Sequence, residues 1–333
     1  MPFFGYSALC GMLVRAKSDP IPGNGDFLHH ALIYDSVENF VDAALPFVRA
    51  GIEADEPVLA RVKRDNAEAL KQALGDDAGA ADVAPAAGFY ETPSRTRAKF
   101  LDWVGEHSGD TRMRILGEPP WPLDFEAGIR EWARHESVIN VAFWGLPVTF
   151  ACPYDEAALP DTIIDCAEST HPLILRSEGS SDSSGYARPE LFVEKLNAQT
   201  PVRGGRPALQ MPFDLGNLDA VRGLVESEGA AAGLQGDRLL DHTLAVDEVA
   251  TNAILHGASP ARLKLWREPG ELIWEVSDTG PGIRDPLAGQ IAPDPAALGG
   301  RGLWMARMIS DSLEFRSDGD GTVVALHFTL PAS

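Results

Sequence analysis

The chain has 333 residues, of which 44% are hydrophobic, and its formal net charge at pH 7 is −21. This length favours two domains, each with enough apolar residues for a core. The acidic balance argues against nucleic acid and anionic membranes as partners, because both select lysine and arginine. Cys10, Cys152 and Cys166 show neither metal-ligand spacing nor a disulfide framework, which favours a reducing cytoplasm.

Residues 1–26 are predicted to form an N-terminal tail, either flexible or packed on the body. Residues 3–14 are apolar, but a stretch of 12 residues is too short to span a bilayer. No basic residue precedes them, so they do not fit a signal peptide.

Strand and helix patterns alternate from residue 27 to about residue 176. This alternation predicts a mostly parallel sheet covered by helices, in which ligands bind where strands end. One helix is expected to begin at Asp35 or Ser36 and to stop at Gly51. The other helices are predicted at residues 65–74, 94–107, 125–138 and 160–169, and the strands at residues 28–34, 57–62, 113–116 and 147–151.

The strand ends of this half carry aromatic, proline and acidic residues, and none carries a phosphate-binding glycine loop. Such side chains suit a small-molecule pocket or a protein contact, and packing at the edge of the core is the alternative for each of them. His29 and His171, taken singly, fit core or cap residues better than ligands. The candidate pocket residues are His29, Tyr34, Tyr90, Trp121 and Tyr154.

Four short segments of residues 27–176 together resemble the MEDS sensory domain. The resemblance implies a degenerate RecA-like fold and a sensory role upstream of an ATPase module. It leaves the sensed ligand open and is compatible with a small molecule. The segments are His29-x-Ala31-Leu32-x-Tyr34, Phe47-Val48-x-x-Gly51, Gly117-Glu118-Pro119, and Cys152-Pro153-Tyr154-Asp155 with Thr170-His171-Pro172.

Residues 177–206 are predicted to be a flexible linker, because residues 178–185 are rich in serine and glycine. One short helix fits residues 188–197. The stretch holds no histidine and is too short for the helical hairpin that carries the phosphoacceptor of a sensor histidine kinase.

A helix predicted over residues 237–256, with Gly257 as its C-terminal cap, holds the most informative side chains. Glu248, Asn252 and His256 are four positions apart and share one face. The Asn252 carbonyl oxygen suits a hydrated Mg²⁺ ion. The Glu248 carboxylate, one turn away, can accept a proton from an attacking hydroxyl. For this helix alone, a solvated polar face is the competing interpretation.

Two glycine-bearing segments follow this helix. A strand predicted at residues 271–278 ends at Asp278, whose carboxylate can accept a hydrogen bond from an exocyclic amine such as that of adenine. Gly280 and Gly282 allow the backbone to approach the ring. The segment Gly299-Gly300-Arg301-Gly302 opens a predicted helix, where free N–H groups and a guanidinium suit phosphates. The three pieces in this order indicate a nucleotide pocket.

These pieces resemble the asparagine box and the two glycine boxes of the GHKL ATPase superfamily. The nearest likeness is to bacterial anti-sigma regulatory factors, which are serine/threonine kinases. The likeness covers residues 207–330 of a domain predicted at residues 207–333, and it implies a Bergerat-type α/β sandwich that binds ATP and Mg²⁺. Further strand patterns at residues 262–266 and 323–330 predict a mixed sheet in this domain. The second glycine box is shorter than in the family. The resemblance implies Glu248 as general base, Asn252 as Mg²⁺ ligand, and His256, Asp278, Gly280, Gly282, Gly300, Arg301, Gly302 and Thr322 as nucleotide-binding residues.

We therefore expect a regulator in which the sensory domain controls a kinase that phosphorylates an anti-sigma antagonist protein. Two alternatives stay open. One is a non-catalytic, ATP-dependent switch that sequesters a sigma factor. The other is a histidine kinase-like protein that acts with a separate phosphoacceptor chain. A homodimer is compatible with all three interpretations, and cytoplasmic localisation is expected.

Overall fold

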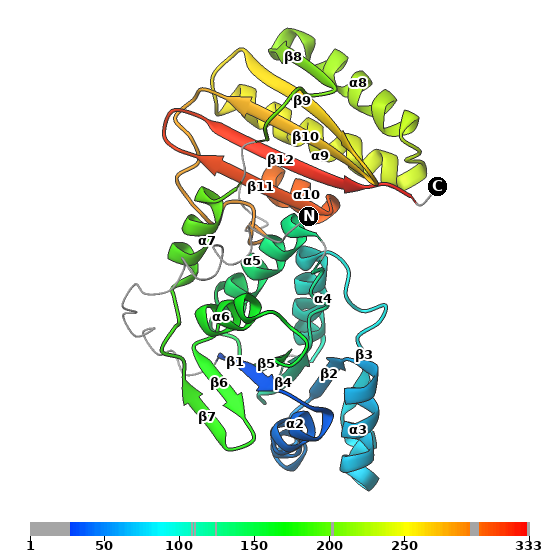
Figure 1. Cartoon of the computed structure of the whole chain (residues 1–333), viewed down its shortest axis with the longest axis vertical. Coiled ribbons are helices and arrows are strands. Elements are labelled where there is room, and N and C mark those ends of the chain that lie inside the picture. The colour runs from blue at the N-terminus through cyan, green and yellow to red at the C-terminus, as the bar shows by residue number, and fades with distance from the viewer. Residues whose placement is uncertain are drawn as a thin grey trace. The chain divides into compact units, whose positions relative to one another are not determined.

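The computed structural model describes residues 27–107, 109, 111–123, 125–200, 203–293 and 300–331 (Figure 1). The predicted tail, residues 1–26, and Gly299 lie outside these ranges. The chain divides into two compact units, residues 1–124 with 132–192 and residues 125–131 with 193–333. Each unit is built on one sheet.

The first unit contains a seven-stranded sheet in the order β3-β2-β4-β5-β1-β6-β7. All neighbouring strands run parallel except β6 and β7. The mostly parallel α/β fold predicted for this half is confirmed. The strands are β1 (Leu28–Tyr34), β2 (Val58–Val62), β3 (Asp82–Pro85), β4 (Met113–Gly117), β5 (Val148–Asp155), β6 (Leu173–Arg176) and β7 (Gly179–Asp182).

Helices cover both faces of this sheet. α2 and α3 pack on one face, in an apolar cluster that includes Leu32, Val48 and Ala60. α4, α5 and α6 lie on the other face, where Phe100 of α4 contacts Phe150 of β5 with ring centroids 5.0 Å apart. The helices are α2 (Val37–Glu53), α3 (Arg64–Leu74), α4 (Pro93–Glu106), α5 (Glu126–Ala142) and α6 (Asp161–Thr170), with a 3₁₀ segment at Gly75–Ala80.

α2 begins as predicted but ends later. Ser36 is its N-cap, and the Ser36 hydroxyl accepts a hydrogen bond from the Asn39 N–H at 3.2 Å. The helix continues through Gly51 to Glu53, so the predicted stop at Gly51 is wrong. A Cβ on Gly51 would lie 2.7 Å from Val58 Cγ2, which shows that close packing requires this glycine.

The stretch predicted as a flexible linker contains regular structure. Gly179–Asp182 forms β7 and pairs with β6 in an antiparallel arrangement. The predicted short helix is present as α7 (Pro189–Ala198). Its apolar side chains Phe192, Val193 and Leu196 are fully buried, which anchors this helix despite the polar residues that precede it.

The second unit has a five-stranded sheet in the order β11-β12-β10-β9-β8, and every pairing in it is antiparallel. The predicted mixed sheet is therefore wrong, whereas the predicted α/β sandwich is confirmed. The elements are β8 (Leu209–Phe213), a 3₁₀ turn (Leu215–Asn217), α8 (Leu218–Ala231), α9 (Gly236–Leu255), β9 (Ala261–Glu268), β10 (Glu271–Asp278), α10 (Arg301–Ile309), β11 (Ser312–Ser317) and β12 (Thr322–Thr329).

α9 is the central helix of this unit and lies against the sheet (Figure 1). Val246, Val249 and Ala253 are buried in one apolar cluster with strand residues such as Trp274. One polar contact crosses this core, because the Trp274 Nε1–H donates to His242 Nε2 at 2.8 Å. Burial, with a smaller effect of Arg238, lowers the pKa of His242 to about 4, so this ring is neutral near pH 7.

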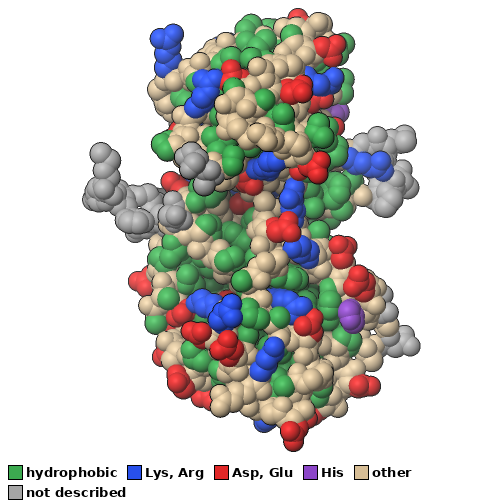
Figure 2. Space-filling model, turned by 90° about the vertical axis from the view of Figure 1, so that its right-hand side faces the viewer, with side chains coloured by type: hydrophobic (Ala, Val, Ile, Leu, Met, Phe, Trp, Pro, Cys, Tyr) green, Lys and Arg blue, Asp and Glu red, His purple; other side chains and the backbone are tan. Residues whose placement is uncertain are grey.

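On the face in Figure 2, Asp and Glu side chains are interspersed with Lys and Arg in both units, so the negative charge is distributed there. Within the described ranges, no helix combines the length and the apolar character needed to cross a membrane.

Candidate functional site

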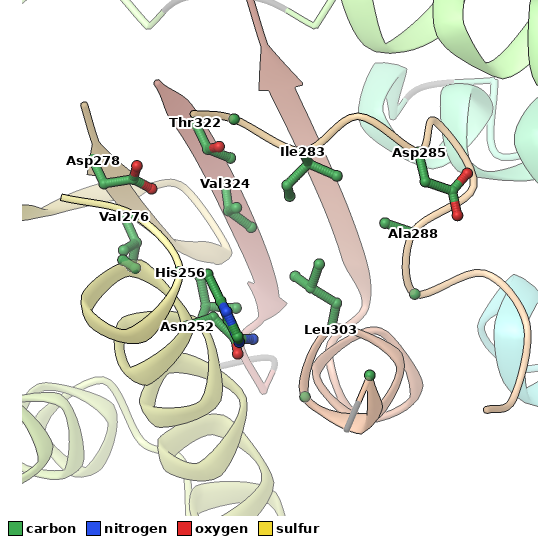
Figure 3. Close-up of a pocket in the computed structure, with 17 residues that line it drawn as sticks. Asn252, His256, Val276, Asp278, Ile283, Asp285, Ala288, Leu303, Thr322 and Val324 are labelled. Carbon is green, nitrogen blue, oxygen red and sulfur yellow. The ribbon is translucent and has the colours of Figure 1, made fainter. Parts of the chain in front are cut away.

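A cavity of about 390 Å³ lies in the second unit, between the C-terminal part of α9, the ends of β10 and β12, and the start of α10 (Figure 3). This volume falls within the roughly 300–1,000 Å³ of typical small-molecule sites. Its walls combine apolar and polar groups. The lining residues are Val249, Asn252, Ala253, His256, Gly257, Val276, Asp278, Gly282, Ile283, Asp285, Ala288, Gly289, Gly300, Gly302, Leu303, Thr322 and Val324.

One wall of the cavity is the polar face of α9. Asn252 and His256 line it, and Leu303 of α10 lies on the other side (Figure 3). Glu248 is one turn before Asn252 and beside the lining. Gly302 packs directly on both, since a Cβ there would lie 2.7 Å from Asn252 Nδ2 and 2.8 Å from Glu248 Oε2. The first turn of α10 thus covers the two side chains that the sequence singles out.

Glu248 is a weaker acid than an ordinary glutamate. Its partial burial raises the pKa of the carboxyl group, and the charge of the adjacent Asp247 raises it further. Asp247 itself forms an ion pair with Arg222, with Nη2 and Oδ2 2.9 Å apart. A carboxylate with a raised pKa is a better proton acceptor at neutral pH.

A second polar corner of the cavity surrounds Asp278, at the end of β10. Asp278 lies opposite Thr322 of β12, and its Oδ1 accepts a hydrogen bond from the Gly280 N–H at 2.8 Å. A Cβ on Gly257 would lie 2.5 Å from that oxygen, and one on Gly280 would lie 2.5 Å from Gly257 Cα. The backbone here therefore requires two glycines so that the carboxylate can sit at the cavity wall.

Gly257 has a different role from the one predicted. α9 ends at Leu255 with His256 as its C-cap, and Gly257 does not adopt the left-handed conformation of a capping glycine. The predicted capping role is wrong. The glycine is required because Asp278 and Gly280 approach it closely.

Ser317 organises the loops at this end of the cavity, and the sequence analysis did not identify it. Its hydroxyl accepts a hydrogen bond from the Ile283 N–H at 2.7 Å and donates to the Gly321 carbonyl at 3.0 Å. Gly282 has a positive φ of 77°, and a side chain on it would collide with that hydroxyl. A single serine on an ordinary strand gives no sequence signal for this role.

Of the predicted phosphate-binding segment, Gly300 and Gly302 lie at the cavity. Gly300 has a φ of 84° and is the N-cap of α10, and it lines the cavity together with Gly302. The backbone N–H groups of the first turn of α10 are thus placed at the cavity, where an anion is favoured. Arg301 is exposed and is not among the lining residues, so its contact with phosphate stays a prediction.

Tyr34, a predicted sensory-pocket residue, belongs to a polar network in the first unit. Its hydroxyl donates to Glu118 Oε1 at 2.6 Å and accepts from Asn66 Nδ2 at 3.0 Å and Lys63 Nζ at 3.2 Å. Burial, together with the Glu118 carboxylate, raises the pKa of this hydroxyl. With Lys63, Asn66 and Asp155 it borders a cavity of about 320 Å³.

Three of the other predicted sensory residues, His29, Trp121 and Tyr154, lie on the opposite face of the sheet, together with His171. Trp121, Tyr154, His171 and His29 form a row, with successive ring centroids 6.1, 5.5 and 4.0 Å apart. The fifth residue, Tyr90, packs against Phe100 and Trp132. The structure therefore separates Tyr34 from the rest of the predicted pocket.

Both halves of the chain match protein-family models. Residues 28–172 match the model of MEDS, the methanogen/methylotroph, DcmR sensory domain, and residues 211–328 match the model of the histidine kinase-like ATPase domain. This chain joins a MEDS domain to a histidine kinase-like ATPase domain. The predicted resemblances to MEDS and to this ATPase superfamily are confirmed, whereas the nearer likeness to anti-sigma regulatory factors stays a prediction. The cavity around Asn252 lies entirely within the matched ATPase domain.

Solved structures also align with the chain, at low identity. The RsbU and RsbW domains of Rv1364c from Mycobacterium tuberculosis align at 20% identity over 39% of this chain and 34% of that one, with a TM-score of 0.29. The catalytic domain of histidine kinase ThkA aligns at 16% identity over 37% of this chain and 96% of that one, with a TM-score of 0.26. The histidine kinase domain of the E. coli osmosensor EnvZ aligns at 19% identity over 40% of this chain and 94% of that one, with a TM-score of 0.24. None of the curated proteins compared matches the chain.

Proposed function

We propose that this protein is a signalling regulator in which the MEDS domain controls phosphoryl transfer from ATP to a serine or threonine of a partner protein. The observation that carries this proposal is the position of Glu248 and Asn252, one turn apart on α9 and both under Gly302, beside a cavity that also holds Asp278. The side chains proposed as metal ligand and as proton acceptor thus lie beside the N-terminal end of α10, where an anion is favoured.

The residues present fit ATP and Mg²⁺. The Asp278 carboxylate lies at the cavity wall, where it could accept a hydrogen bond from the amine of adenine. Gly257 and Gly280 lie so close to it that a side chain on either would collide with Asp278. Asn252 supplies a hard oxygen ligand for Mg²⁺, and the N–H groups at the start of α10 suit phosphate oxygens. When bound, Mg²⁺ supplies positive charge that stabilises the phosphates during transfer.

Glu248 would act on the partner protein. Its carboxylate, with its raised pKa, would accept the proton of the attacking serine or threonine hydroxyl. Arg301, at the first position of α10, would add a charge-assisted contact to the phosphates. We propose an anti-sigma antagonist as the partner, because the segments at residues 248–257, 278–282 and 300–303 together resemble the serine/threonine kinases that act on such proteins.

Calorimetric titration tests the pocket. ATP is titrated into the full chain with and without Mg²⁺, for the wild type, Asn252→Ala and Thr251→Ala. We expect Mg²⁺-dependent binding in the wild type, its loss in Asn252→Ala, and near wild-type affinity in Thr251→Ala, since Thr251 does not line the cavity. Undiminished Mg²⁺-dependent affinity in Asn252→Ala would overturn the metal assignment.

Labelled phosphate tests the reaction. The full chain is incubated with γ-labelled ATP and a purified anti-sigma antagonist, and the stability of the label in acid is measured. Acid-stable label on the antagonist supports the proposal. Acid-labile label would favour histidine phosphorylation instead, and ATP binding without any transfer would favour the non-catalytic switch.

A further inference from the structure

A cluster of four potential metal ligands lies in the interior of the MEDS domain. It comprises His29 of β1, Glu136 of α5, Cys152 of β5 and His171, which follows α6. None of these side chains is more than 2% exposed. One ligand atom from each lies within 4.8 Å of the other three. The four residues come from separate elements, and the fold alone brings them together.

The separations between the ligand atoms suit a tetrahedral ion. His29 Nε2 lies 3.5 Å from Cys152 Sγ and 3.9 Å from Glu136 Oε2, and His171 Nε2 lies 3.3 Å from the same carboxylate oxygen. Zinc bonds of about 2.0–2.3 Å to N, O and S imply ligand-to-ligand separations of roughly 3.3–3.8 Å in a tetrahedron. Little movement would therefore be needed to place an ion among them.

Hydrogen bonds orient both imidazole rings toward the cluster. His171 Nδ1 lies 2.8 Å from the Ala167 carbonyl, which can only accept, so Nδ1 carries the proton. Asn140 donates its Nδ2 to the carbonyls of Ser137 and Thr170, and therefore presents Oδ1 to His29 Nδ1 at 3.2 Å. In both histidines the Nε2 lone pair then faces the cluster, as in metal-binding histidines held by an outer hydrogen bond.

Two polar atoms of the cluster are unsatisfied in the protein alone. Glu136 Oε2 and His171 Nε2 are buried and have no hydrogen-bond partner among the described residues. A buried carboxylate oxygen and imidazole nitrogen without partners are costly, and such atoms call for an explanation. These two atoms lie 3.3 Å apart, so either a proton or a metal cation held between them would satisfy both.

We propose that His29, Glu136, Cys152 and His171 form a binding site for a divalent transition-metal ion of the Zn²⁺ type. One thiolate, two imidazoles and one carboxylate suit Zn²⁺ and disfavour Mg²⁺ and Ca²⁺, which prefer oxygen ligands. Four protein ligands complete a tetrahedron, as in structural sites. The alternative of a nucleophilic thiol is disfavoured, because Cys152 is only 1% exposed and a substrate cannot reach it directly.

The bound ion would connect β1, β5, α5 and the segment after α6. It would therefore stabilise the MEDS domain in the metal-bound state by mass action. The contacting rings of Trp121, Tyr154 and His171 would connect this metal site to Trp121, which follows the end of β4. The proposal is independent of nucleotide binding, because all four ligands belong to the MEDS domain.

Cobalt substitution tests the site in the full, untagged chain. The protein is stripped with a chelator and titrated with Co²⁺. We expect one equivalent to give the visible bands of tetrahedral Co²⁺ and a near-ultraviolet thiolate charge-transfer band. Metal analysis of protein purified without chelator is expected to find one Zn²⁺ per chain. Full occupancy should raise the unfolding temperature relative to the stripped protein.

Two cysteine variants separate this site from other thiols. Cys152→Ser is expected to lose the thiolate band and to bind the metal at least about 100-fold more weakly. Cys166→Ser, which changes the other described buried cysteine, should keep both properties. A folded wild type that gives no tetrahedral Co²⁺ spectrum overturns the proposal. Retention of the thiolate band in folded Cys152→Ser, or its loss in Cys166→Ser, overturns the assignment of Cys152.

Asn140→Ala tests the orientation of His29 without removing a ligand. We expect its affinity for Co²⁺ to fall about 10- to 100-fold while the thiolate band is kept at saturation. Unchanged affinity would contradict the role given to the His29–Asn140 hydrogen bond.

Discussion

The two domains place their polar chemistry at different depths. In the ATPase domain the core is apolar apart from pairs such as His242 with Trp274, and Asn252, His256 and Asp278 line an open cavity. In the MEDS domain the densest set of potential ligands lies at the centre, between the sheet and α5. Side chains at a cavity can bind and release a nucleotide, whereas buried side chains suit a resident ion or a structural role. We therefore expect substitutions at the ATPase cavity to change activity with little effect on stability. Substitutions in the buried MEDS cluster should change metal binding and stability together.

The largest separation is expected for Glu248→Gln. Loss of a general base should reduce phosphoryl transfer by about 10²- to 10⁴-fold, while ATP affinity changes little. Because folding raises the pKa of Glu248, its ionised form costs stability, so the amide should raise the unfolding temperature near pH 7. This gain should disappear as the pH falls and the wild-type carboxyl is protonated. Transfer assays and thermal unfolding measure the two effects.

Asp247→Asn is the matched control for Glu248→Gln, since it keeps the proposed base and removes only the neighbouring charge, the smaller of the two causes that raise the pKa of Glu248. It should retain most of the transfer activity. Wild-type transfer by Glu248→Gln would mean that another group, or water, accepts the proton.

Gly257→Ala should displace Asp278 and so distort the cavity in the ATPase domain. The added methyl group would push on Asp278 Oδ1 and the Ala253 carbonyl, at a cost of about 1–3 kcal/mol in stability and with weaker ATP binding. Gly223→Ala in α8 is the control, because a Cβ there meets no atom within 4 Å and should stabilise the helix by about 0.5–1 kcal/mol. Unchanged ATP affinity in Gly257→Ala would separate Asp278 from nucleotide recognition. Denaturant unfolding and calorimetry supply both values.

His242 should make the ATPase domain sensitive to acid. Folding lowers its pKa from about 6.5 to about 4, so the stability that depends on the neutral ring is present above pH 6.5 and is lost as the pH falls toward 4. His242→Gln keeps an acceptor for the Trp274 N–H but cannot gain a charge. The stability difference between wild type and variant should therefore narrow from pH 7 to pH 4. Parallel changes in both proteins would show that other groups determine the acid response.

Ser36→Ala should have the smallest effect, about 1 kcal/mol, because it removes the N-cap acceptor of the Asn39 N–H in α2. Ser36→Asn, which can still accept that hydrogen bond, should restore most of the loss in denaturant unfolding. Equal stability of both variants and the wild type would show that water replaces this cap.

The gathering of Asn252, His256 and Asp278 at one cavity could be predicted, because the segments that carry them are short and follow one another in the sequence. Glu248 and Asn252 are one helical turn apart, and Asp278 and Gly280 lie in one turn, so local geometry places each pair. The MEDS cluster gives no such signal, since even His29 and its partner Asn140 are 111 positions apart. His29, Cys152 and His171 stand in the segments that resemble MEDS, but no local pattern shows that the sheet and helices bring them together with Glu136.

Glycine shows a second limit of sequence reasoning. Gly51 and Gly257 each follow a helical pattern, and a glycine in that place predicts a helix stop. The structure requires them because Arg114 and Val58 approach the first and Asp278 approaches the second. Such contacts join distant segments, and no local pattern reports them. β7 was missed for a similar reason, because Gly179–Asp182 has no apolar alternation and depends on β6 for pairing.

β7 also affects how this protein can associate. It is one of the two edge strands of the seven-stranded sheet, and all four of its residues, Gly179 to Asp182, are exposed. Open strand edges attract strands from other chains, and short polar edges with charged residues discourage this. A second molecule that joined here would gain main-chain hydrogen bonds but would cover no apolar side chain of β7. Self-association of this protein is therefore better sought on its other surfaces.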